Sequence, residues 1–249
     1  MKITVMDFHR ILKCAVLSGG CLVGSIFAAD FTNGSTLDPT PLIPPDLPGG
    51  FSESEEVSVE GLPSLGKWMA TRHHEVAHWL NEIYFGKQLR EPVNVVFLDP
   101  VAKTEAEAEA RLIAAMTLAG FPIRFGHSDG YVALIGGVEY HMLPRQKRTA
   151  FSDGPFEFNN NHGRIFGPHR DASGFWFTGA FSRERVDPVG KVKHEYVSFN
   201  QARDRLAEQL DRSTFYKWVN FVDLKNHLLC RRDLTTGDHD GLAPLLIAL

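Results

Sequence analysis

The chain has 249 residues, of which 43% are hydrophobic and 22% are charged, with a formal net charge of −4. This composition excludes a mostly disordered, collagen-like or coiled-coil protein. The chain has no long basic stretch, which argues against nucleic-acid binding, because neutralising phosphates needs clustered Lys and Arg.

The first 29 residues have the pattern of a secretory signal peptide. Three basic residues precede an uncharged run from 14 to 29, which ends in small side chains. The run is shorter than the roughly 20 residues that a membrane-spanning helix needs. Cleavage after Ala28 or Ala29 is expected, which predicts an exported protein, either periplasmic or secreted. Two alternatives stay open, an uncleaved signal that tethers the protein to the membrane and lipidation at Cys21.

Removal of residues 1–29 leaves 220 residues, with 23 basic and 29 acidic side chains and Cys230 as the only cysteine. One cysteine gives no disulfide framework, so the fold has to rest on a hydrophobic core, for which this length is sufficient. Residues 30–63 are rich in Pro and Glu and predict a disordered tether. A single folded domain is therefore expected over residues 64–249.

Three segments of the folded part predict helices. In residues 64–86, Met69, Val76, Leu80 and Ile83 recur at three-to-four-residue spacing, which is typical of a helix with one apolar face. The other two expected helices are 104–118, capped by Thr104 with Glu107 three residues on, and 200–210, capped by Asn200.

Short runs rich in β-branched and aromatic residues predict the strands between these helices. The expected strands are 92–98, 131–135, 156–166, 175–181, 194–199 and 215–222. Glycine, proline and aspartate between 167 and 174 predict a turn region that joins the two longest strands. The order of elements predicts an α+β fold, in which a mixed β-sheet carries helices packed mainly on one face.

One motif points to zinc chemistry. His74, Glu75 and His78 form the pattern H-E-x-x-H, in which two histidines one helical turn apart bind Zn²⁺ and the glutamate activates water. On the expected helix, however, His74 and His78 lie roughly opposite the apolar face, and no later third ligand is evident. A solvent-exposed helix with coincidental histidines is the competing interpretation.

A second constellation lies in the expected strands. Two-residue alternation puts His162 and Arg164 on one face of a strand, and His194 belongs to another strand later in the chain. Arg203 and Asp204 follow in the first turn of the next helix. If these segments are neighbours, their side chains converge on a site that suits an anionic group. The competing interpretation is that Asp204 pairs with nearby arginines at the surface.

Several short motifs occur in the order of a known family. They are Glu91-Pro92-Val93-Asn94, Gly120-Phe121-Pro122, Pro144-Arg145-Gln146, Asn161-His162-Gly163-Arg164, Phe175-Trp176-Phe177-Thr178-Gly179-Ala180, His194 and Ala202-Arg203-Asp204. Through them the region from Pro92 to Leu210 resembles the LssY C-terminal domain family of bacterial envelope-associated domains. The resemblance implies an accessory domain of the cell envelope and no established reaction. The chain departs from the family at Asn161, Lys147 and Glu195.

These observations predict an exported cell-envelope accessory domain without a cofactor. It would bind an anionic or lipid-derived ligand through the His/Arg/Asp cluster, and envelope or membrane components are its expected partners. One alternative is a zinc-dependent hydrolase or metallopeptidase that uses His74 and His78 as ligands and Glu75 as base. The other alternative is a non-catalytic structural protein of the envelope.

Overall fold

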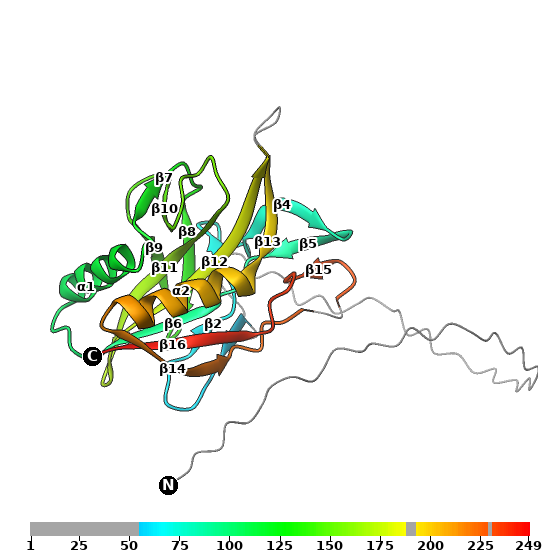
Figure 1. The fold of residues 1–249 in the computed structure, drawn as a ribbon. Helices are drawn as coiled ribbons and strands as arrows, with labels where there is room; N and C mark the ends of the chain where they lie inside the picture. Colours follow the sequence, from blue (N-terminus) through cyan, green and yellow to red (C-terminus); the bar gives the residue numbers. More distant parts are fainter. Residues whose placement is uncertain (1–54, 188–192, 229–230) are drawn as a thin grey trace, which may run out of the picture. The chain divides into compact units, whose positions relative to one another are not determined.

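A computed structural model describes residues 55–187, 193–228 and 231–249 (Figure 1). The chain divides into two compact units, residues 1–44 and 45–249, and every described residue belongs to the second. The expected signal peptide, most of the expected tether and Cys230 lie outside the described residues.

Thirteen strands form one mixed sheet: β1 (Glu56–Val57), β2 (Leu65–Gly66), β3 (Ala70–Thr71), β6 (Val95–Asp99), β7 (Ile123–Phe125), β8 (Tyr131–Ile135), β9 (Val138–Leu143), β10 (Thr149–Ser152), β11 (Asn160–Asp171), β12 (Gly174–Asp187), β13 (Lys193–Ser198), β14 (Tyr216–Asp223) and β16 (Leu242–Ala248). The main path runs β1-β2-β8-β9-β11-β12-β6-β16-β14, and the sheet curls strongly into a half-barrel. A second sheet contains β4 (His78–Tyr84), β5 (Lys87–Arg90) and β15 (Leu234–Thr235).

Side chains of the central strand β6 alternate between two hydrophobic cores. Val95 and Phe97 pack in one core with residues of both helices, α1 (Glu105–Leu118) and α2 (Phe199–Ser213). Val96 and Leu98 pack in a second core, which contains no helical residue. Both faces of β6 are therefore buried, which explains its apolar sequence from Val95 to Leu98. Figure 1 shows α2 lying across the central strands.

Both helices begin where a side chain caps them. Thr104 accepts a hydrogen bond from the backbone N–H of Glu107 (3.1 Å), and Ser198 accepts one from that of Gln201 (2.8 Å). Because β13 runs directly into α2, the cap of α2 is Ser198 and not the expected Asn200. Leu112, Leu206 and other apolar residues on the inner faces of the helices are fully buried.

The pair β11–β12 is the longest hairpin of the described residues. The two strands pair in antiparallel register from Asn160 opposite Glu184 to Asp171 opposite Gly174, with an irregularity after Phe166. The strand expected at 156–166 is thus displaced along the chain, and the strand expected at 175–181 is too short. The turn lies at residues 172–173, because the Gly167–Pro168 region bends the strand without ending it.

The expected helix at 64–86 is wrong. This segment contains β2, β3 and the whole of β4, and Trp79 is buried while its neighbour Leu80 is 58% exposed. Its pairing with β5, from His78 opposite Arg90 to Tyr84 opposite Lys87, makes β4 a strand, and Phe85 and Gly86, both with positive φ, turn the chain into β5. The spacing of the apolar residues was therefore coincidental.

The coarse outline of the predicted fold is confirmed as a mixed-sheet domain. It is dominated by strands and has two helices among its described residues, whereas a sheet covered by helices was expected. The folded part also begins before residue 64, because Val57 in β1 is buried in the second core.

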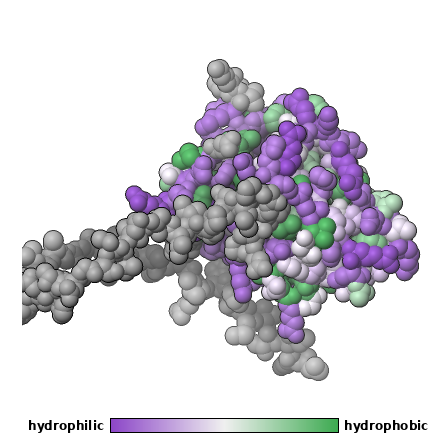
Figure 2. All heavy atoms as spheres, turned by 180° about the vertical axis from the view of Figure 1, so that it is seen from behind, coloured by the Kyte–Doolittle hydropathy of each residue, from purple (hydrophilic) through white to green (hydrophobic). Residues whose placement is uncertain are grey.

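The surface and the helices complete this outline. On the face in Figure 2, hydrophilic residues predominate and hydrophobic ones form small separate patches. Neither described helix combines the length and hydropathy needed to cross a membrane.

Candidate functional site

A pocket lined by both charged and aromatic side chains lies on the face of the large sheet opposite the helices. In β12, Phe177 and Phe181 point to the helices and Ala180 points to the second core, so alternation places Ser182 and Glu184 on the second face. The pocket has a volume of about 80 Å³. Its lining residues are Trp79, Leu80, Glu91, His127, Ser128, Phe156, His162, Arg164, Glu184 and His194.

Three neighbouring strands supply the centre of the pocket. Asn160 and His162 of β11 lie opposite Glu184 and Ser182 of β12, and His194 of β13 lies opposite Val186. Residues opposite one another in an antiparallel pair point to the same face, so the imidazoles of His162 and His194 approach the Glu184 carboxylate from two sides.

His127 enters the pocket from the loop after β7. The backbone N–H groups of Gly126 and His127 both donate to the carbonyl of Arg148, which holds this loop against the chain before β10. The His127 ring stacks on that of His162 with centroids 4.6 Å apart, and it meets the edge of Phe156 at 5.5 Å.

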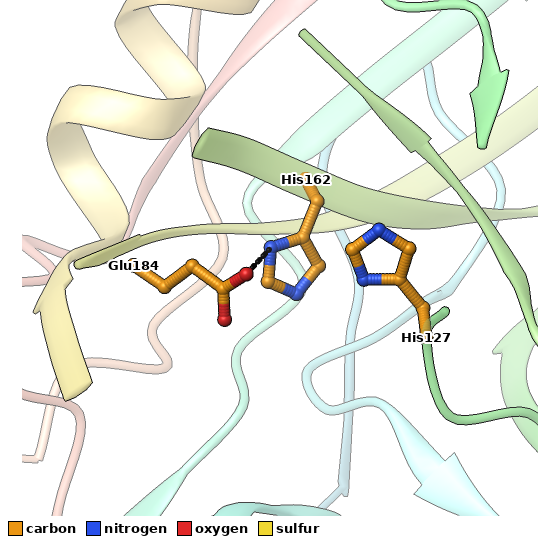
Figure 3. A group of neighbouring side chains, drawn as sticks. All are labelled: His127, His162 and Glu184. Atoms are coloured by element: carbon orange, nitrogen blue, oxygen red, sulfur yellow. Dashed lines mark ion pairs between the residues drawn. The ribbon is translucent and has the colours of Figure 1, made fainter. Parts of the chain in front are cut away.

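His127, His162 and Glu184 form a possible metal-binding group (Figure 3). Each offers one ligand atom, and these three atoms lie within 4.8 Å of one another. All three residues are buried, and His162 Nδ1 lies 3.7 Å from Glu184 Oε1. Within the described ranges, no other group of three His, Cys, Asp or Glu residues offers ligand atoms this close together.

Hydrogen bonds fix the carboxylate of this group. Glu184 Oε1 accepts from the amide of Asn160 (2.6 Å), and Glu184 Oε2 lies 2.9 Å from His194 Nδ1. The Asn160 amide oxygen in turn lies 3.0 Å from His162 Nδ1. The second ring nitrogens of His127 and His194, both Nε2, are buried without a hydrogen-bond partner among the described residues. An unpartnered buried polar atom destabilises the fold by on the order of 1–3 kcal/mol, so a ligand bound to these nitrogens would recover that free energy.

Burial keeps the imidazoles of His127 and His162 neutral by lowering the pKa of each. Burial lowers the pKa of His162 well below its ordinary value, and the Arg164 charge adds to this. Burial, again with Arg164, lowers the pKa of His127 to about 4. Burial raises the pKa of Glu184. Neutral imidazoles keep the lone pair that a metal ion needs.

Arg164 and Glu91 form the charged wall of the pocket. Arg164 Nη2 donates to the carbonyl and the hydroxyl of Ser128 (2.8 and 3.1 Å), and the guanidinium lies 5.2 Å from the Tyr131 ring. Arg164 Nε is buried without a partner among the described residues. Burial raises the pKa of the Glu91 carboxyl to about 7, against the opposing effect of Arg164.

The structure brings together three of the five residues expected from the sequence. His162, Arg164 and His194 line the pocket, whereas Arg203 and Asp204 do not. Arg203 donates to Asp204 (2.8 Å), to Asp240 and to the carbonyl of Leu242 (2.7 Å). Arg203 belongs to α2, which packs on the other face of the sheet, so it ties this helix to the start of β16.

The H-E-x-x-H motif does not have the geometry of a zinc helix. His74 lies in a turn with φ of 64° and pairs with Glu139 (2.7 Å), whereas His78 begins strand β4. The alternative in which His74 and His78 lie one helical turn apart around an ion, with Glu75 as base, lacks its helix, and so does the competing interpretation of a solvent-exposed helix.

Sequence reasoning missed His127, Glu184 and Glu91. The expected strand at 175–181 ended before Arg183-Glu184-Arg185, yet extending its alternation by three residues would have placed Glu184 beside His194. His127 lies in a glycine-flanked loop without periodicity, and only the fold reveals its position.

Comparisons with known proteins give no information about this site. No family model matches the chain, and neither the search of curated proteins nor the search of solved structures found a match. The resemblance to LssY C-terminal domains therefore stays a prediction.

Proposed function

We propose that this domain binds a divalent transition-metal ion, Zn²⁺ in the first instance, through His127, His162 and Glu184. The observation that carries the proposal is the convergence of three ligand atoms within 4.8 Å in a buried pocket. Two histidines and one carboxylate are a known ligand set for zinc with an open fourth position. Because Zn–N and Zn–O bonds are about 2.0–2.2 Å long, small side-chain rotations would bring the atoms onto one ion.

Two further observations support a metal ion at this place. The lowered pKa values of His127 and His162 leave both imidazoles unprotonated at neutral pH. The hydrogen bond between His194 and Glu184 is the kind of outer contact that orients a ligating carboxylate. His194 therefore positions the ligand Glu184 in this proposal.

The pocket also limits the ligand expected from the sequence. Its volume of about 80 Å³ is far below the roughly 300–1,000 Å³ of sites that enclose a whole small molecule. It can hold an ion with a small anionic group beside Arg164, so a lipid-derived ligand would insert its headgroup only. In keeping with the expected signal peptide and the LssY resemblance, we propose that this metal-binding domain is an exported accessory domain of the cell envelope.

Zinc titration tests the proposal. The purified full chain is freed of metal by a chelator and titrated calorimetrically with Zn²⁺. We expect one ion per chain and a loss of affinity of at least about 100-fold in His162→Gln and Glu184→Gln. For the outer contact, His194→Gln should cost about 10–100-fold. The exposed His141 gives the matched control His141→Gln, which should bind as the wild type does.

The same titration separates the alternatives. Zinc binding that survives in His162→Gln and Glu184→Gln but is lost in His78→Gln would move the metal to the H-E-x-x-H segment and contradict the proposal. A wild-type chain that binds no zinc would favour the structural envelope protein. Circular dichroism of each metal-free variant shows whether its fold is retained.

A further inference from the structure

The Glu91 carboxyl is the one acid of the pocket without a hydrogen bond among the described residues. The side chain lines the pocket and the residue is 8% exposed. Its position is fixed, because its backbone N–H donates to Ala77 and its carbonyl accepts from Met69, both at 3.1 Å. The carboxyl thus lines the pocket with its hydrogen-bonding capacity unused by the described residues, so it can accept from a molecule in the pocket. Its pKa of about 7 suits proton exchange near neutral pH.

Arg164 provides the complementary feature. It is 4% exposed, and two contacts to Ser128 use only its Nη2 group. Arg164 lines the pocket, and its buried Nε has no partner among the described residues, so the Ser128 contacts leave part of the guanidinium's donor capacity unused. An arginine beside a proposed metal ion favours a dianionic group, and phosphate matches the planar geometry of guanidinium.

The size of the pocket restricts the class of substrate further. A phosphoryl group at the end of a molecule can enter a space of about 80 Å³, whereas a diester would have to pass both of its substituents out of it. Trp79, Leu80 and Phe156 line the pocket with apolar surface, which can contact the rest of the substrate. A phosphate monoester meets both conditions.

We infer that the pocket hydrolyses a phosphate monoester, with Glu91 as the proton acceptor for the attacking water and Arg164 as the group that holds the phosphoryl oxygens. This inference rests on the proposed metal site. Water gives one proton to the Glu91 carboxylate while its oxygen bonds to phosphorus. The bond from phosphorus to the ester oxygen breaks, and the proton passes from Glu91 to that oxygen. The products are inorganic phosphate and an alcohol.

Two phosphate esters test the role of Glu91 in the zinc-loaded full chain. p-Nitrophenyl phosphate has a good leaving group, whereas phenyl phosphate has a more basic one that needs a proton. We expect Glu91→Gln to lower kcat by about 100-fold or more. The loss should be larger for phenyl phosphate, a difference that a merely structural role would not produce. Zinc affinity and KM should stay within about threefold of the wild type.

A matched control and the contrary outcomes complete the experiment. Glu195 is a partly exposed acid of β13 outside the pocket, paired with Arg185 and Lys193, and Glu195→Gln should leave both rates unchanged. The inference is overturned if Glu91→Gln keeps the wild-type rate. It is equally overturned if the zinc-loaded wild type cleaves neither ester faster than His162→Gln does, or cleaves only the diester bis(p-nitrophenyl) phosphate. If the wild-type chain binds zinc without cleaving the monoesters, the proposed metal site stands and only the hydrolysis is rejected. If it binds no zinc, the metal site and the hydrolysis are both rejected.

Discussion

At the scale of single residues, Gly163 has no room for a side chain. It separates His162 from Arg164 on β11, and an added Cβ would lie 2.3 Å from the Ala180 carbonyl oxygen and 2.5 Å from the Phe181 ring. We expect Gly163→Ala to lower the free energy of unfolding by about 1–3 kcal/mol, the usual loss at an overpacked site. Urea unfolding measures this loss. Ser173→Ala in the exposed hairpin turn should change stability little, and an equal loss in both variants would contradict the steric argument.

His239 should make stability depend on pH. It is fully buried with Nε2 2.8 Å from the Asn226 amide oxygen, and burial, with Arg203 adding to it, lowers its pKa to about 3. Unfolding restores the ordinary value of 6.5, so between these values the unfolded chain binds the extra proton. The free energy of unfolding therefore falls as pH falls through this window, by up to about 1.4 kcal/mol per pH unit from this group.

His239→Gln removes this titration while keeping an N–H donor near Asn226. The variant should show a shallower decline of unfolding free energy below pH 6.5, measured by urea unfolding across the window. His141→Gln at the surface should keep the wild-type slope. An unchanged slope in His239→Gln would show that other groups carry the acid sensitivity.

The predictable part of the site followed from local alternation. His162 and Arg164 share a strand, and two-residue periodicity alone placed them on one face. The expectation that Arg203 lies beside them was wrong, because the sequence does not indicate on which face of the sheet α2 packs. His127 reaches the pocket through a loop, for which no periodic rule exists.

At the scale of elements, the Thr104 cap made the prediction of α1 successful, and the short apolar run of β8 predicted that strand. The prediction for 64–86 failed because a few apolar residues matched the wrong period. The strand β16 was missed because its apolar run contains Pro244, and proline argues against a central strand. In the structure, pairing with β6 begins only at Leu245, so the missing N–H of Pro244 is not needed on that side.

Arg203 should act on stability and not on the pocket. Arg203→Ala removes the donor to the Leu242 carbonyl and the ion pair with Asp240, which we expect to cost on the order of 1–3 kcal/mol in urea unfolding. Zinc affinity should stay at the wild-type value. Arg205→Ala, at an exposed position of the same helix, is the control and should cost little. A large loss of zinc affinity in a folded Arg203→Ala protein would contradict this prediction and show that Arg203 contributes to the site.

At the scale of the whole molecule, metal and fold should be coupled. The ligands come from β11, β12 and the loop after β7, so an ion held by all three stabilises the folded chain over the unfolded one. At a free zinc concentration of 100 times Kd, the gain is about 2.7 kcal/mol. Thermal unfolding with zinc and with chelator measures it. The His162→Gln chain should unfold at the same temperature in both conditions, and a zinc-induced rise in that variant would contradict the coupling.

The place of β16 has a consequence for how the chain acquires its structure. Residues 245–247 lie parallel to residues 96–98, so the middle of the sheet joins segments about 150 positions apart. While a ribosome is still adding residues 99–241, β6 has an open edge of backbone donors and acceptors. The centre of the sheet can be completed only after translation of β16, and pairing between segments so far apart in sequence favours slow folding.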